Sequence, residues 1–132
     1  MANEAVCIET PTKFARRTVA DGAGIAFGTI LYFSGDPNTA AASSAADQSF
    51  AGIAWEEKTA SDGITEITVA MNGVWDITAT NAGQNLGTAV AIGGANLSVT
   101  ADAADLLNGA FLGITCETVA ANEVNRVEVR PY

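Results

Sequence analysis

The chain has 132 residues, of which 48% are hydrophobic, and carries six basic and fifteen acidic side chains with no histidine, which gives a formal net charge of -9. This length suits one compact domain, or two small halves that share a core. The negative charge argues against nucleic acid as a partner, because a phosphate backbone is bound by a cationic surface. The absence of histidine excludes Ser-His-Asp and Cys-His catalysis and zinc sites built on histidine.

Half of the six basic residues lie close to the N-terminus. Lys13, Arg16 and Arg17 precede a long acidic remainder. Solvated surface charge is one interpretation of this group, and docking to an acidic protein surface is the other. We predict an extended N-terminal arm over residues 1–19, in which the three basic side chains meet acidic groups of a partner and Phe14 serves as an apolar anchor.

Most later segments alternate between apolar and polar residues and are broken by turn residues about every ten positions, which is typical of an all-β protein with short strands. The clearest pattern covers residues 64–78, where Ile67, Val69 and Met71 share one face and Asn72-Gly73 predicts a tight hairpin turn. The other predicted strands cover residues 6–9, 28–33, 50–56, 88–92, 97–100, 111–117 and 124–129.

Two segments lack this alternation. Residues 39–48, TAAASSAADQ, have little side chain to bury and predict a surface loop or a single helical turn. Residues 102–109, DAADLLNG, predict one helical turn capped by Gly109. The glycine-rich residues 22–29 fit no phosphate-binding motif and predict a turn that enters a strand.

An internal repeat is the most informative feature of the chain. FGT at residues 27–29 leads through a variable loop into FAGI at 50–53, and LGT at 86–88 leads in the same way into FLGI at 111–114. A glutamate, a short polar turn and an alternating strand follow each copy. We predict a single β domain over residues 20–132, in which two units, at about 27–79 and 86–130, close on each other as halves of one small barrel or sandwich.

The residues do not suggest catalysis. Glu56 and Glu57 are adjacent on a strand and therefore point to opposite faces. Asp102 and Asp105 lack the dense oxygen-ligand spacing of a calcium loop. Both pairs are interpreted as solvated surface, so we expect no enzyme, no cofactor, no metal site and no small-molecule substrate.

The cysteines and tryptophans allow two interpretations each. Cys7 and Cys116 have no metal-binding spacing and are expected to be free, buried thiols, although they could pair if the two ends of the chain meet. Trp55 and Trp75 are interpreted as core residues, with subunit contact as the alternative. The sequence contains no long apolar run and no signal peptide, which predicts synthesis in a cytoplasm and no membrane partner.

The repeated step resembles a family of small capsid decoration, or cement, proteins of tailed bacteriophages, long known as a domain of unknown function. The matching positions are Gly52-Ile53-Ala54 with Glu56, and Gly113-Ile114-Thr115 with Glu117, each followed by a turn and an alternating strand. The resemblance covers roughly residues 10–130. The chain departs from the family in its long loop at 39–48 and in Trp55.

The resemblance implies an all-β fold of the β-tulip or small-barrel type that assembles as a homotrimer on the outer surface of the virion. It implies the major capsid protein as the partner. Lys13, Phe14, Arg16 and Arg17 are then our predicted capsid contacts, and subunit contact stays the alternative to a core position for Trp55 and Trp75. The implied function is to stabilise the head by bridging capsid subunits. The alternatives are a self-assembling bacterial surface or appendage β-protein, which predicts an export signal, and a hydrolase that uses carboxylates alone.

Overall fold

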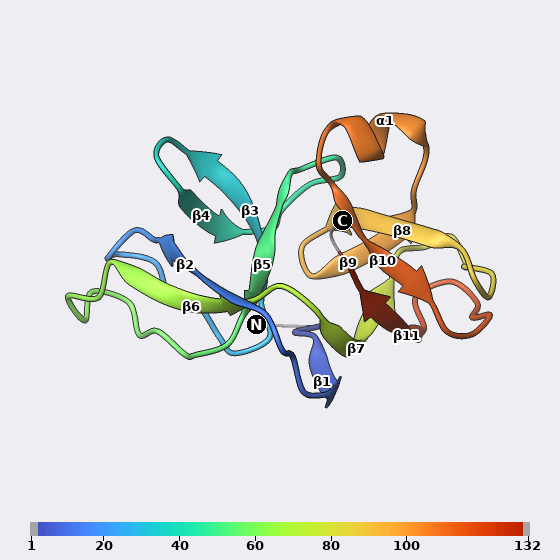
Figure 1. Ribbon diagram of the computed structural model, residues 1–132, viewed down its shortest axis with the longest axis horizontal. Coiled ribbons are helices and arrows are strands. Elements are labelled where there is room, and N and C mark those ends of the chain that lie inside the picture. The colour runs from blue at the N-terminus through green and yellow to red at the C-terminus, as the bar shows by residue number, and fades with distance from the viewer. Residues whose placement is uncertain (1–2, 131–132) are drawn as a thin grey trace.

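Two small β-barrels lie side by side in the computed structural model, which describes residues 3–130 (Figure 1). The first barrel has the closed order β2-β4-β3-β5-β6, and the second has the order β7-β11-β10-β8-β9, closed by a pairing of β7 with β9. A further strand, β1, pairs with β7 alone. The strands are β1 (Val6–Glu9), β2 (Phe14–Thr18), β3 (Ile30–Gly35), β4 (Thr39–Ala42), β5 (Phe50–Ala54), β6 (Glu66–Ala70), β7 (Gly73–Ala79), β8 (Ala89–Gly94), β9 (Leu97–Thr100), β10 (Phe111–Thr115) and β11 (Val124–Val129).

The second barrel repeats the pairing pattern of the first. In each barrel the first strand runs parallel to the third, with Thr18 opposite Thr39 in one and Thr78 opposite Leu97 in the other. The predicted all-β barrel class is confirmed. The two repeat units nevertheless do not form halves of one barrel, because a fifth strand, β2 or β7, precedes each unit and completes a separate ring.

The step from Asn72 to Gly73 joins the two barrels. β6 pairs with β2 and β5, whereas β7 pairs with strands of the second barrel. Of the two turn residues only Gly73 has a positive φ, of 108°, whereas the type I′ hairpin turn that Asn-Gly favours needs two. The Asn72 side chain instead accepts hydrogen bonds from the backbone N–H groups of Thr12 and Lys13, at 2.9 and 3.1 Å. The predicted hairpin is therefore wrong, although both of its strands are present.

The two segments without alternation behave differently. The loop predicted at residues 39–48 is wrong for its first part, because Thr39–Ala42 forms β4 and pairs with β3. Small alanine side chains suit the narrow barrel, and Ala40 is buried. The predicted helical turn is confirmed as α1 (Ala103–Leu107), followed by Gly109 with φ 75°. Within the described chain, no helix is long and apolar enough to cross a membrane.

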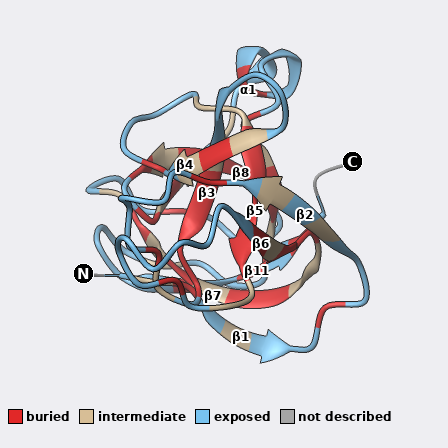
Figure 2. Cartoon of the chain, turned by 90° about the vertical axis from the view of Figure 1, so that its left-hand side faces the viewer, coloured by how far each residue is buried: buried red, intermediate tan, exposed pale blue. Residues whose placement is uncertain are grey.

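One hydrophobic cluster connects the interiors of both barrels. Buried stretches lie mainly in the strands, whereas most connecting loops are exposed (Figure 2). The largest buried side chains of this cluster are Ile25, Ile30, Leu31, Ile53, Ile67 and Val69 from the first barrel, and Trp75, Ile77, Val90, Ile92, Leu112 and Val127 from the second. The barrels thus share a core.

Hydrogen bonds also connect the two barrels directly. Asn96, in the β8–β9 turn, accepts a hydrogen bond from the Ile30 N–H at 2.8 Å and donates its own N–H to the Ser43 hydroxyl at 3.0 Å. The Phe50 N–H donates to the Gly109 carbonyl at 2.8 Å. Because buried polar groups are costly unless paired, these contacts fix how the barrels lie against each other.

The glycine of the repeated motif is explained by close strand packing. A Cβ atom at Gly52 would lie 2.5 Å from the Cγ2 atom of Val69. A Cβ atom at Gly113 would overlap the backbone carbonyl of Glu128 on the paired strand β11. In both barrels, therefore, the neighbouring strand occupies the space that a side chain would need.

We expect Gly113→Ala to lower the free energy of unfolding by about 3 kcal/mol, because a backbone carbonyl cannot move aside as a side-chain tip can. Gly87→Ala is the matched control, since Gly87 has φ 74° but nothing within 4 Å of an added Cβ. It should cost about 1 kcal/mol from backbone strain alone. Urea unfolding measures both values, and equal losses would contradict this explanation.

A buried carboxyl group lies on α1. Asp105 is only 3% exposed. One of its oxygens accepts the Asp102 N–H at 2.8 Å, as part of the capping box of the helix, and the other has no hydrogen-bond partner. Burial raises the pKa of Asp105 above its ordinary value and the adjacent Asp47 raises it further, although the Asp102 N–H lowers it. The predicted solvated surface is thus wrong for Asp105.

A raised pKa stabilises the fold below the unfolded pKa, and this contribution is lost as the pH rises through the folded pKa. Asp105→Asn removes the titrating group. Between about pH 4 and pH 7, the difference in unfolding free energy should therefore shift in favour of the variant. Urea unfolding across this range measures it, with the exposed Glu57→Gln as control. A difference that does not change with pH would contradict the assignment.

Candidate functional site

An aromatic cluster runs from the shared core to the surface. It consists of Phe14 on β2, Phe27 before β3, Trp55 after β5 and Trp75 on β7. The ring of Trp55 is the centre, with centroid distances of 5.5 Å to Phe14, 5.1 Å to Phe27 and 6.0 Å to Trp75. Trp75 is completely buried, whereas Phe14 is 44% and Phe27 is 40% exposed. The cluster therefore exposes the rings of Phe14 and Phe27 to the solvent, and the buried ring of Trp75 lies at its inner end.

Backbone pairing holds these rings in place. Phe14 lies opposite Ala70 in the β2–β6 ladder, and the Trp55 N–H donates to the Thr68 carbonyl at 3.0 Å. The indole N–H of Trp75 donates to the Asn72 carbonyl at 3.1 Å. Rigid, partly exposed aromatic side chains are typical of protein interaction hot spots, because little conformational entropy is lost when a partner covers them.

The basic residues predicted to bind a partner have separate roles. The Arg16 side chain, half exposed, lies 3.2 Å from Glu66 and 3.8 Å from Glu56 and donates to the Thr68 hydroxyl at 2.7 Å. Its charge is thus compensated within the protein. Lys13 is exposed and follows Thr12 at the junction held by Asn72.

Arg17 is partly buried against strands of the first barrel. Its guanidinium group donates to the Ala51 carbonyl at 2.9 Å and to the Asn38 side chain at 3.0 Å, and it lies 4.8 Å from the centroid of the Phe33 ring. Burial lowers the pKa of Arg17. Of the four predicted contacts, the structure brings Phe14 into the aromatic cluster and leaves Arg17 partly buried against the first barrel.

The region predicted as an arm is paired to both barrels. β1 adds to β7 of the second barrel, and β2 is a strand of the first, paired with β6 from Phe14 to Thr18. A strand that completes a closed ring can leave it only by opening the barrel. Residues 14–18 therefore present a fixed surface.

Phe27 is the cluster member that sequence reasoning missed. It was included in a segment interpreted only as a turn. The signal was its place in the repeat, directly before Gly28-Thr29, where the second copy has Leu86, which is 65% exposed. A large apolar residue is thus exposed at the same step of both barrels.

Other features of the surface are less specific. Cys7 is partly buried, which raises its pKa, and Cys116 is exposed, contrary to the prediction that both thiols are buried; neither forms a disulfide. Residues 3–130 contain no group of three or more acidic or cysteine side chains that could hold a metal ion.

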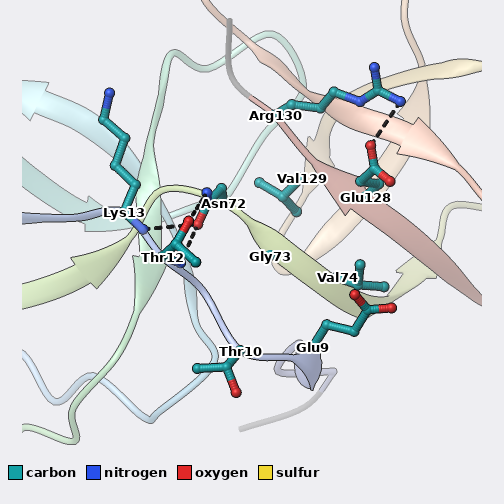
Figure 3. A pocket seen from close by; sticks show the side chains of 10 residues that line it. All are labelled: Glu9, Thr10, Thr12, Lys13, Asn72, Gly73, Val74, Glu128, Val129 and Arg130. Atoms are coloured by element: carbon teal, nitrogen blue, oxygen red, sulfur yellow. Dashed lines mark hydrogen bonds and ion pairs between the residues drawn. The ribbon is translucent and has the colours of Figure 1, made fainter.

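A groove of about 400 Å³ lies beside the strand ends of the second barrel (Figure 3). Lys13 lies on one side of it, and an Arg130–Glu128 ion pair of 2.9 Å on the other. Its lining residues are Glu9, Thr10, Thr12, Lys13, Asn72, Gly73, Val74, Glu128, Val129 and Arg130. With acidic and basic groups intermixed, the groove favours no single class of ligand.

Comparison with known proteins adds a fold relationship. No family model matches the chain, and no curated protein matches it. The fold is similar to that of the N base of head fiber gp8.5 in bacteriophage phi29, with a TM-score of 0.56 and 13% sequence identity over 90% of this chain and 96% of that chain. At this identity the similarity shows a common fold.

We expect Phe27→Ala to lower the free energy of unfolding by about 1 kcal/mol, because its ring is partly exposed but packs on Trp55. The tryptophan emission should shift to the red as Trp55 becomes more hydrated. Phe33→Ala, at a ring that is also 40% exposed, should leave the emission unchanged. An identical spectrum for Phe27→Ala would contradict the arrangement of the cluster.

Proposed function

We propose that this protein is a structural component of a bacteriophage head, which binds the outer surface of the capsid as a decoration, or cement, protein. The observation that carries the proposal is the fold similarity to the base of a phage head fiber, which extends over nearly the whole of both chains. The motif resemblance to capsid decoration proteins points to the same setting. We also propose that the protein has no catalytic role.

The aromatic cluster is the proposed anchor on the shell. Phe14 and Phe27 would enter apolar depressions of the major capsid protein, supported by the fully buried Trp75. Arg16 lies on the same strand as Phe14, and its pairs with Glu56 and Glu66 could exchange partners with charged groups of the shell. Partner exchange of this kind contributes to specificity and orientation more than to affinity.

Stabilisation of the head follows if one decoration unit touches two capsid subunits. Separating those subunits would then require the decoration contacts to break as well. We propose that a homotrimer provides such a bridge. The net charge of -9 is consistent with a position outside the shell, because it disfavours binding to the packaged DNA.

A second candidate function is the base of a longer head appendage. It is favoured by the same comparison, since the similar region of the phi29 protein is itself the base of a fiber. Both candidates require binding to the head.

Sedimentation with undecorated, expanded heads tests head binding. The protein should pellet with the heads and saturate at a fixed ratio to the shell protein. Phe14→Ala combined with Phe27→Ala should weaken binding by about a hundredfold, since a central aromatic anchor contributes about 2 kcal/mol or more.

Phe33→Ala is the control for this experiment, because it removes an equally exposed ring outside the cluster. Light scattering on the free protein measures the proposed trimer. Absence of the protein from pellets of its own virus's heads would contradict the proposed function. Full binding by the double variant would contradict the proposed anchor alone.

A further inference from the structure

A group of acidic residues lies where the two barrels meet beside α1. The chain between β4 and β5, residues 43–49, reaches from the first barrel to the second next to α1 (Figure 1). The Asp47 N–H donates to the Ile92 carbonyl on β8 at 3.3 Å, and the Ser49 hydroxyl donates to the Asn108 carbonyl after α1 at 2.6 Å. Residues 43–49, here called the bridging loop, are therefore held against the second barrel.

The buried carboxyl group of Asp105 meets this loop. One Asp105 oxygen accepts the Asp102 N–H at 2.8 Å, and the Asp102 side chain accepts the Asp105 N–H in return at 3.1 Å. The other Asp105 oxygen, Oδ1, is buried and has no hydrogen-bond partner. The Asp47 carboxyl group lies within hydrogen-bonding range of Asp105, but two carboxylates both accept and neither donates. The pair therefore needs a positive charge or a proton between its oxygens.

No cationic side chain compensates this pair. Neither lysine nor arginine occurs in residues 18–57 or 59–125, which include β3, β4, the bridging loop, β8, β9 and α1. Within residues 3–130, none of Asp47, Asp102 and Asp105 takes part in an ion pair. A carboxylate that is removed from water is costly unless a positive charge accompanies it. The neighbouring elements of the chain do not supply that charge.

The atoms around the pair are those that a hard cation binds. Carboxylate and backbone carbonyl oxygens, together with water, are the usual ligands of Ca²⁺ in proteins. The Asp105 carboxyl group is already buried, whereas Asp47 is exposed and leaves a route from the solvent. The Gln48 side chain accepts the N–H groups of Ser44 and Ala45 at 2.9 and 3.2 Å, which holds the bridging loop in shape.

We propose that Asp47 and Asp105 bind one hard divalent cation of the calcium type between the two barrels, with backbone carbonyls and water completing its ligands. The ion neutralises both carboxylates and connects the bridging loop of the first barrel to α1 of the second. The sequence did not predict this site, because Asp47 and Asp105 are far apart in the chain. The inference goes beyond the proposed function, since the site does not depend on binding to a head.

Calorimetric titration of the chelator-treated protein with CaCl₂ at neutral pH tests the site. One ion should bind per chain, with a dissociation constant of about 10⁻⁴ to 10⁻³ M, at the weak end of the range for calcium sites. Asp105→Asn should weaken binding by about tenfold or more, because it removes the charge of the buried ligand. Asp47→Asn should weaken binding similarly, and it changes an exposed residue that is not part of the core.

Asp36→Asn is the matched control, because it removes the same charge from an exposed carboxylate in the β3–β4 turn. It should leave calcium binding unchanged. Equal weakening by Asp36→Asn and Asp105→Asn would overturn the site, because calcium would then be attracted only by the net charge of -9. Absence of calcium binding at neutral pH would also overturn it, and a proton shared by the two carboxyl groups would then suffice.

Hydrogen exchange of the free protein tests the position of the ion. The Phe50 N–H donates to the Gly109 carbonyl across the two barrels. This amide should exchange about tenfold more slowly when calcium is present at about ten times its dissociation constant. Exchange at Phe50 that does not respond to calcium, or that slows equally in Asp105→Asn, would overturn the proposal. Both experiments use the free protein, so their failure leaves the proposed head binding intact.

Discussion

Parallel pairing of the first strand with the third in each barrel is the contact on which the rest of the structure depends. It joins Thr18 to Thr39 in one ring and Thr78 to Leu97 in the other. Ring closure removes the open edges of five-stranded sheets that would otherwise favour aggregation. Ring closure also fixes β2 in the first barrel, so that Phe14 and Arg16 lie on a rigid surface. β1 lies outside both rings.

The aromatic cluster connects this architecture to the proposed function. Phe14 and Trp55 belong to the first barrel, whereas Trp75 belongs to the second and lies in the core that both share. A load applied at the exposed rings would therefore be carried by both barrels rather than by one loop. This arrangement fits the proposed structural role, in which binding must persist under mechanical stress.

Local patterns in the sequence predict most strands. They fail where contacts between residues far apart in the sequence determine the local structure. β1 and α1 follow from alternation and from capping residues. β4 was missed because its alanines give no apolar contrast, although they pack inside a narrow ring. Asn72-Gly73 has the composition of a hairpin turn, but contacts with Thr12 and Lys13 direct the chain into a second barrel.

The candidate site shows the same limit. Phe14 was predicted as an apolar anchor, and Trp55 and Trp75 as core residues or subunit contacts, but the contact between these rings depends on barrel closure. Cryo-electron microscopy of decorated heads would show whether the aromatic cluster is the anchor on the shell. We expect two adjoining barrels on the outside of the shell, with Phe14 and Phe27 against the major capsid protein. Heads that lack this density, or that carry it with the aromatic cluster facing the solvent, would contradict it.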